Sequence, residues 1–503
     1  MTADLAGQLY DVSLMGSVVI FALVCTVYLR RNLFSVFHPL TWYAAFHGMV
    51  FVFRPIVARI SEFELVYRAF RFSPTPADKL TVIVAANLGF IAFAAACPSA
   101  GDRPMRFPAD AAAAVQRRLM TPLFVWVLAI CVPLGIYSLS QTWNSAADTG
   151  IAFSGMVRDL ATGVYINTEG NGYITDAQLM LASCTAIFAW IHRFRLLACL
   201  PLAFFILFRA GTGGRGPFIT ALATAALLLL YERRQRAPTL RVVALAAGAL
   251  VMFNVVGADR GEMIRSTFGS ESPVSGRTRV DERFLEGMDF ANLEYFEYLV
   301  YAIPQRTGTY GYFTDVLQVV TEPIPRKLWP GKPIGAPLDS IRLFDYGTPI
   351  GMTRSLPGAG WYGLGWLGVL LWCGAWGHVL GRLYRRFVDG AMGAPQVIAY
   401  TTFLPILIIA FRDGQVVTIF RQGVFFLAPI GLWVVLSRLA GVPSIAAIRA
   451  ALLRRTGPEA LPADAAQSPP SRARADLPPA VRRRRAALAS AANQPAVQVL
   501  DPG

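Results

Sequence analysis

The chain has 503 residues, of which 55% are hydrophobic and only 15% are charged, and its formal net charge at pH 7 is +15. A mean hydropathy of +0.47 excludes an ordinary soluble globular protein and indicates a chain with many membrane spans. The positive charge alone could suggest a nucleic-acid partner, but where the charges lie is more informative than their sum.

Apolar segments long enough to cross a membrane recur along the chain. A helix needs roughly 20 apolar residues to cross the hydrocarbon core, and it satisfies its own backbone there, whereas an open sheet cannot. The sequence therefore predicts an all-α, polytopic membrane protein with about 11 transmembrane helices. The predicted spans are residues 12–29, 36–53, 79–97, 120–140, 176–192, 195–210, 216–231, 240–258, 358–381, 394–411 and 422–437.

Every second loop between these spans is basic. Arginines follow the first, third, fifth, seventh and ninth predicted spans, for example Arg30 and Arg117. Basic residues in short loops favour the cytoplasmic side of a membrane. We therefore predict a periplasmic N-terminus and a cytoplasmic C-terminus. The outer loop 54–78 departs from the rule, because it also carries arginines.

Four regions follow from this pattern. Residues 1–258 form a membrane domain with the first eight predicted spans, and residues 358–437 carry the last three. Between them, residues 259–357 are predicted to be one long periplasmic loop that contains short helices. Residues 438–503 are rich in arginine, alanine and proline, and we predict a disordered basic cytoplasmic tail near the anionic leaflet, not a nucleic-acid-binding arm.

A short outer turn contains the first candidate site. The glycine-rich run 213–216 precedes a predicted helix, and Arg209 lies just before it. Glycine lets backbone amides approach an anion closely, and arginine binds phosphate through two parallel hydrogen bonds. Arg209, Arg215 and the backbone of Gly214 and Gly216 are therefore predicted to bind a diphosphate. The alternative is a tight turn between helices with interfacial arginines.

The last outer loop supplies a second set of cations. Arg412 and Arg421 bracket this loop, and Asp413 follows the first of them. Both arginines are candidates for binding the same anion. Structural pairing of Arg412 with Asp413, or with another helix, is an equally good interpretation.

Acidic residues in the long loop offer a general base. At 100° per residue, Glu286, Asp289, Glu294 and Glu297 fall on one broad face of a predicted helix. Glu294 and Glu297 are the candidate bases, because a positioned carboxylate can activate a sugar hydroxyl. The alternative is that the row is only the solvated face of an interfacial helix.

The sequence shows no familiar metal or nucleotide motif. It contains no H-E-x-x-H, no Cys/His cluster and no G-x-x-x-x-G-K-[ST] pattern. We therefore predict no metal and no cofactor, with the charge of a diphosphate neutralised by arginine. Electrostatic stabilisation of the leaving diphosphate would then be the main catalytic effect.

Four stretches carry a resemblance to a known family. They are Gly214-Arg215-Gly216, Tyr310-Gly311, the run Ile-Pro-Arg-Lys-Leu-Trp-Pro-Gly-Lys-Pro at 324–333, and the glycine-rich run 358–368. With the predicted layout of residues 12–437, the chain resembles the oligosaccharide repeat-unit polymerases, the O-antigen polymerase family of bacterial envelopes.

This resemblance implies an enzyme of the bacterial inner membrane. It would polymerise lipid-linked repeat units at the outer face, moving the growing glycan from polyprenyl diphosphate to a new repeat unit in O-antigen or exopolysaccharide biosynthesis. Arg215 and Arg326 are then expected to be catalytic, and Arg326 and Lys332 to join the diphosphate site. Membrane lipid, a chain-length regulator and a flippase are the other expected partners.

Two other functions fit parts of the sequence. An O-antigen ligase, or a related lipid-diphosphate glycosyltransferase, would use the same donor with a different acceptor. A polysaccharide or lipid transporter would carry charges in mid-membrane and show repeat symmetry, whereas the charges here gather at the predicted outer interface.

Overall fold

The structure is a computed structural model in which two compact units are recognised, Met1–Ile445 and Ala446–Gly503. Its described residues are 3–107, 111–149, 156–158, 165–167, 174, 176–212, 216–240, 243, 285–287, 291–324, 328–332, 336–338, 341–347, 353–390 and 393–456. In the second unit the description covers the greater part of helix α19 (Ile445–Thr456). The first unit contains every other element and the candidate site.

Seven segments of the described chain are long and apolar enough to cross a membrane. Five of them are built around single helices, namely α1 (Ala3–Arg30), α5 (Pro76–Ala100), α16 (Leu356–Asp389), α17 (Ala394–Asp413) and α18 (Val416–Leu439). The segment Pro39–Ile60 joins α2 (Pro39–His47), the π-helix η1 (Gly48–Phe53) and α3 (Arg54–Ile60). The segment Ala111–Asn144 joins α6 (Ala111–Met120), η2 (Thr121–Leu123) and most of α7 (Phe124–Thr149).

Three shorter apolar helices complete the bundle: α9 (Leu179–Ile191), α10 (Leu196–Gly211) and α11 (Gly216–Glu232). The seven long segments match seven of the predicted spans, and the short helices match three more. The predicted span 240–258 lies almost entirely outside the described residues. The helical, membrane-embedded class is thus confirmed, while the count of 11 stays a prediction.

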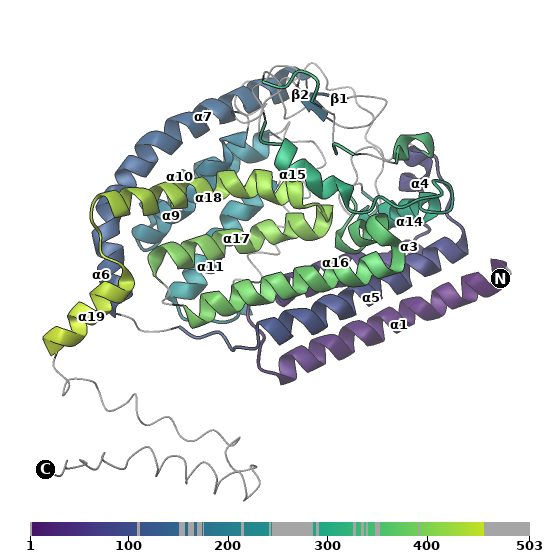
Figure 1. Ribbon diagram of the computed structural model, residues 1–503, viewed down its shortest axis with the longest axis horizontal. Coiled ribbons are helices and arrows are strands. Elements are labelled where there is room, and N and C mark those ends of the chain that lie inside the picture. The colour runs from purple at the N-terminus through teal and green to yellow at the C-terminus, as the bar shows by residue number, and fades with distance from the viewer. Residues whose placement is uncertain are drawn as a thin grey trace, which may run out of the picture. The chain divides into compact units, whose positions relative to one another are not determined.

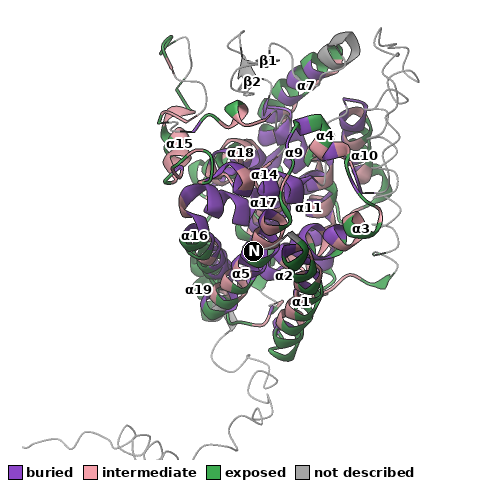
Figure 2. Cartoon of the chain, turned by 90° about the vertical axis from the view of Figure 1, so that its right-hand side faces the viewer, coloured by how far each residue is buried: buried purple, intermediate pink, exposed green. Residues whose placement is uncertain are grey.

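Few other elements occur among the described residues. They are α4 (Leu65–Phe70), α14 (Asn292–Ala302), η4 (Thr314–Leu317), α15 (Gln318–Thr321), η5 (Leu343–Asp345) and the strands β1 (Met156–Arg158) and β2 (Tyr165–Asn167). The two strands are antiparallel, with Val157 opposite Ile166. Helix α14 is buried against α5 and α16 (Figure 2), so this part of the predicted loop packs into the bundle. The division of the chain at residues 258, 357 and 437 stays a prediction.

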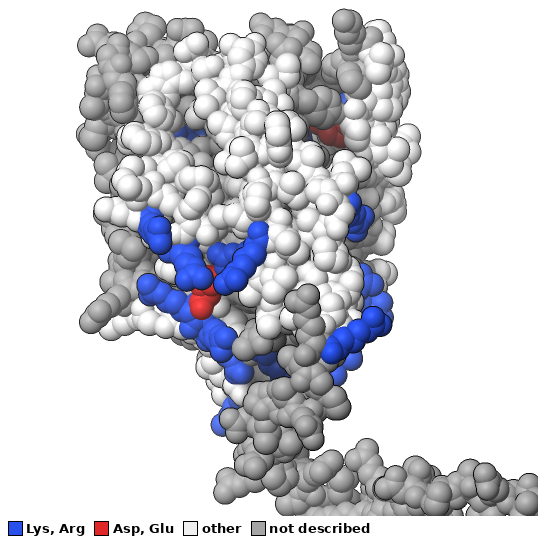
Figure 3. All heavy atoms as spheres, turned by 90° about the vertical axis from the view of Figure 1, so that its left-hand side faces the viewer, with Lys and Arg blue, Asp and Glu red and all other residues white. Residues whose placement is uncertain are grey.

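The basic loops gather at one end of the bundle. Arg103 lies 3.6 Å from Asp389, Tyr384 donates a 2.9 Å hydrogen bond to the carbonyl of Arg103, and Arg117 pairs with Glu232. Figure 3 faces this end, where basic side chains gather around acidic ones. The ends of α1, α17 and α18 that bear Asp11, Arg412 and Arg421 lie at the other end (Figure 1). The side of the membrane on which each end lies stays a prediction.

The glycine-rich start of α16 turns back on itself. The helix is interrupted at Leu364 and Gly365, and Gly365 has a φ of +57°. The break brings Gly360 against Gly368, so closely that a Cβ on Gly368 would lie 2.0 Å from the Gly360 carbonyl oxygen. Only glycine permits both the left-handed turn and this approach.

Two of the stretches that carry the family resemblance meet at this turn. The amide of Gly311 donates a 2.8 Å hydrogen bond to the carbonyl of Tyr362, and the amide of Tyr312 donates one of 3.0 Å to Gly363. A Cβ on Gly311 would clash with the ring of Tyr362. The Tyr310-Gly311 pair therefore fixes the re-entrant start of α16.

Candidate functional site

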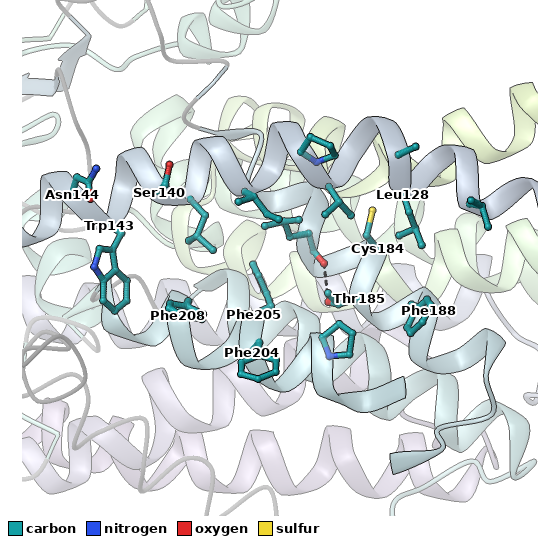
Figure 4. A pocket seen from close by; sticks show the side chains of 18 residues that line it. Leu128, Ser140, Trp143, Asn144, Cys184, Thr185, Phe188, Phe204, Phe205 and Phe208 are labelled. Carbon is teal, nitrogen blue, oxygen red and sulfur yellow. Dashed lines mark hydrogen bonds between the residues drawn. The ribbon is translucent and has the colours of Figure 1, made fainter. Parts of the chain in front are cut away.

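An apolar groove runs between α7, α9 and α10. Its volume is about 920 Å³, which is at the upper end of ordinary ligand cavities. Phe204, Phe205 and Phe208 line it from α10 and Cys184 and Phe188 from α9 (Figure 4). Nearly every lining side chain is apolar, so the groove suits a long hydrocarbon chain.

Apart from Thr185, which lies along the groove, the polar side chains of the lining are near one end (Figure 4). Trp143 and Asn144 of α7 lie there beside Phe208 (Figure 4). Arg209 is the residue after Phe208 and lies one helical turn beyond Phe205, the lining residue four positions earlier on α10. Its residue surface is only 4% exposed. Arg209 is therefore a buried basic residue that directly follows the lining of the groove along α10 and is not part of that lining among the described residues.

Arg209 has unused hydrogen-bonding capacity. One terminal nitrogen donates a 2.6 Å hydrogen bond to the Thr212 hydroxyl, and that hydroxyl donates one of 2.7 Å to the Arg209 carbonyl. The Nε of Arg209 is buried and has no hydrogen-bond partner among the residues that the structure describes. A buried donor without an acceptor is unfavourable, and an anion at this position would satisfy it.

A series of charged contacts connects Arg209 with α18 and with the segment after α15. Asp176 stabilises the charge of Arg209 and also pairs with Arg421 of α18. Glu322 lies 4.0 Å from Arg421 and 3.9 Å from Lys332. The ammonium of Lys332 also donates a 3.1 Å hydrogen bond to the Glu322 carbonyl. We call Arg209, Arg421, Lys332, Asp176 and Glu322 the cationic cluster.

Arg412 lies at the C-terminal end of α17, with the predicted partner Asp413 beside it. The carbonyl oxygen of Arg412 accepts hydrogen bonds from the Ser355 amide (2.7 Å) and the Asn292 side chain (2.8 Å). The Nε of Arg412 is buried and finds no partner within the described ranges, and the Arg412 charge acts on Asp413. Both the anion-binding and the pairing interpretations therefore retain support.

Of the other predicted anion-binding residues, the structure describes only Gly216. Gly216 is the exposed first residue of α11. Gly214, Arg215 and Arg326 lie outside the described residues, so their predicted roles have no structural description. Arg209, Lys332 and Arg421 are linked through Asp176 and Glu322, and their role in binding a diphosphate stays a prediction.

The predicted bases lie in a different group of contacts. Glu294 forms an ion pair with Arg54, and the two side chains are 1% and 0% exposed. The Nε of Arg54 donates a 2.9 Å hydrogen bond to the Leu285 carbonyl. Arg54 follows directly after the π-helix η1, a rare geometry that is common at functional positions.

Glu297 lies one turn further along α14. It is 1% exposed and accepts a 2.6 Å hydrogen bond from the Tyr67 hydroxyl. Burial raises the pKa of Glu297 to about 7, against the opposing effect of Lys79. The solvated face considered for this helix is therefore wrong for Glu294 and Glu297, because α14 packs these carboxylates inward against Arg54 and Tyr67.

The two predicted roles are thus separated in the structure. The ionisable groups that dominate around Glu297 are Lys79, Glu294, Tyr67 and Arg54, and none of these belongs to the cationic cluster. Beside Tyr67 and Lys79 is a second cavity of about 310 Å³, with Phe72 and Arg68 in its lining. This volume is near the lower limit of ligand cavities.

Glu297 provides a pH-dependent test of this arrangement. Its pKa is raised above the ordinary value of 4.5, so the folded chain holds the proton more tightly than the unfolded chain. This contribution to stability is present below about pH 4.5 and is lost as the pH rises through about 7. We expect the melting temperature to fall by roughly 5 °C between pH 5 and pH 8.

A Glu297→Gln variant should lose most of this dependence, because glutamine is neutral throughout the range. Thermal unfolding of both proteins in lipid nanodiscs measures the effect, with Glu62→Gln, an exposed position, as control. Equal pH slopes in wild-type and Glu297→Gln protein would contradict it.

Sequence reasoning missed several residues of these groups. Arg54 had a usable signal, since it is basic in a loop predicted to lie outside. Asp176, Thr212 and Tyr67 had none, because single polar residues at helix ends are common. Among the residues that the structure describes, no group of three or more His, Cys, Asp or Glu side chains is arranged to hold a metal ion.

Comparison of the chain with protein-family models, with curated proteins and with solved structures finds no match. The candidate function therefore rests on the site itself and on the resemblance of the sequence stretches.

Proposed function

We propose that this protein is a membrane glycosyltransferase that uses a polyprenyl-diphosphate-linked donor. In its specific form, it polymerises oligosaccharide repeat units at the outer face of the bacterial inner membrane. The observation that carries the proposal is the apolar groove together with the buried Arg209, which lies one helical turn beyond Phe205 of its lining. A long apolar chain joined to a doubly charged headgroup is complementary to such a site.

The groove would hold the polyprenyl chain. Burying apolar surface stabilises binding by about 25 cal/mol per Å², and the phenylalanines of α10 supply much of that surface. The diphosphate would then lie at the end of the groove. Arg209, which follows Phe208 of the lining, has an Nε without a partner in the described part of the chain, and Arg421 and Lys332 add positive charge.

The chemistry would be a displacement at the anomeric carbon of the donor. A hydroxyl of the acceptor repeat unit forms the new bond, the bond to the diphosphate oxygen breaks, and its electron pair leaves with the diphosphate. Preorganised cations stabilise the developing charge. Arg209, Arg215, Arg326, Lys332, Arg412 and Arg421 are proposed for this role. The hydroxyl proton would pass to water, because Glu294 and Glu297 pack against Arg54 and Tyr67, apart from the cationic cluster.

Metal independence is the feature of this proposal that is easiest to test. Purified protein in nanodiscs is supplied with lipid-linked repeat units, and the glycan length is followed by gel electrophoresis. We expect the rate in EDTA to equal the untreated rate, because arginine provides the positive charge. Raising the salt from about 0.1 M to about 1 M should slow the reaction, since the screening length falls from about 10 Å to about 3 Å.

The same assay separates the alternatives. Activity that disappears with EDTA and returns with Mg²⁺ or Mn²⁺ would overturn the arginine mechanism. Transfer only to a lipid A–core acceptor would identify a ligase. Movement of the lipid-linked unit across the bilayer without any longer product would identify a transporter.

A further inference from the structure

A set of large apolar side chains is exposed just after the Tyr310-Gly311 turn. These residues are Leu317, Val320, Ile324, Leu328 and Trp329, which we call the exposed apolar set. Val320 is 72% exposed and Leu328 is 78% exposed. Leu317 and Val320 are three residues apart in the short helical turns of η4 and α15, which places them toward one side, and Ile324 follows just after α15.

Contacts place this set beside membrane helices and not beyond their ends. Glu322 lies 4.0 Å from Arg421, which is in the second turn of α18. Just before the set, the ring of Phe313 stacks on Trp372 of α16, with centroids 5.1 Å apart. Helix α15 accordingly contacts α18, as Figure 1 shows.

The neighbouring surface of α18 is itself apolar and exposed. Phe420 and Val424, on either side of Arg421 in sequence, are both nearly half exposed. On a membrane-spanning helix, such side chains face lipid. The exposed apolar set therefore adjoins a lipid-facing surface at the depth of the second turn of α18.

The chemistry of the set suits the boundary between headgroups and acyl chains. Tryptophan is enriched at that boundary, because its ring is apolar and its N–H is polar. Lys332 holds the end of the segment through hydrogen bonds to the carbonyls of Glu322 (3.1 Å) and Ile324 (3.2 Å). The segment is thus tied to its own backbone while Leu328 and Trp329 remain outward.

We propose that the exposed apolar set is an interfacial anchor that inserts Leu328 and Trp329 into one leaflet of the membrane. Its partner is the lipid at the headgroup boundary, in the manner of interfacial amphipathic segments. The anchor holds Lys332 and Glu322 of the cationic cluster at headgroup depth. It does not depend on the proposed reaction, so either can fail alone.

A fluorescent label at position 328 tests the anchor. The six native cysteines are replaced, Leu328→Cys is introduced, and the protein is labelled with NBD and placed in nanodiscs. Lipids with bromine near the headgroup end of their acyl chains quench only labels at that depth. We expect the Leu328→Cys label to lose about half of its emission and to shift to the blue.

Two matched positions calibrate the result. Leu23→Cys, on an exposed face of α1, should be quenched best by bromine deep in the chain. Glu62→Cys, in the exposed turn after α3, should not be quenched. Quenching at position 328 no stronger than at position 62 would overturn the proposal, including the case in which a protein covers the set instead.

A second background protects the test against misfolding. The native cysteines are buried or half-buried, so Leu328→Cys can also be labelled in the otherwise unchanged chain, with unmodified protein as the blank. The same quenching is expected there. Its absence in both backgrounds, with the melting temperature unchanged, would also overturn the anchor.

Discussion

Replacing Arg54 with alanine is expected to destabilise the folded protein by about 3–5 kcal/mol, the range measured when one partner of a buried ion pair is removed. Arg54 and Glu294 are both essentially inaccessible to solvent. Without the guanidinium group, the Glu294 carboxylate would stay buried without its opposite charge. The Arg54→Ala protein should therefore show a sharply lower melting temperature and a reduced yield of folded protein from the membrane.

Two matched variants decide whether the unpaired charge is the cause. Arg54→Met combined with Glu294→Leu removes both charges and keeps the volume, so it should regain most of the stability. Arg59→Ala breaks an exposed ion pair with Asp11, and it should lower stability by less than about 1 kcal/mol. Melting curves in nanodiscs measure all three. An Arg54→Ala protein that melts like Arg59→Ala would refute the explanation.

The membrane helices were predictable because their signal is local. A run of apolar residues is evident in one window of sequence, and the predicted spans 12–29 and 394–411 lie inside α1 and α17. Lengths were less predictable. The span predicted at residues 36–53 extends to Ile60 in the structure, because the π-helix η1 is followed directly by α3.

Pairings were not predictable, because they join distant segments. Arg54 and Glu294 are 240 residues apart, and Asp176 and Arg421 are 245 apart. The helical spacing of Glu294 and Glu297 was recognised. It could not show whether their shared face met water or protein, and the packing of α14 against α5 and α16 decided that question.

The candidate site was likewise predictable only in part. Arg209, Arg421 and Lys332 were identified because basic residues on a predicted outer side need a reason to be there. The groove could not be predicted, because it is the space left between three helices. That space depends on how Trp143, Phe188 and Phe204 pack, and single-sequence periodicity does not describe packing.

Arg209 is the residue whose loss should affect activity most. Removing one preorganised donor to a developing negative charge typically lowers the rate by about 10²–10³-fold. The Arg209→Ala variant is therefore expected to leave unpolymerised repeat units on the carrier lipid. Arg209→Lys should recover only part of the rate, because an ammonium group cannot donate two parallel hydrogen bonds to a phosphate.

The supporting contact offers a graded test of the same mechanism. Thr212→Val removes the hydroxyl that holds the Arg209 side chain and keeps the volume similar, so it should cause a smaller loss than Arg209→Ala. Arg59→Ala is the matched arginine control. For each folded variant, product length is measured on gels and substrate binding is measured by fluorescence quenching. Polymer of normal length from well-folded Arg209→Ala protein would remove this residue from the site, and the end of the groove would then lack the anion partner on which the proposed function depends.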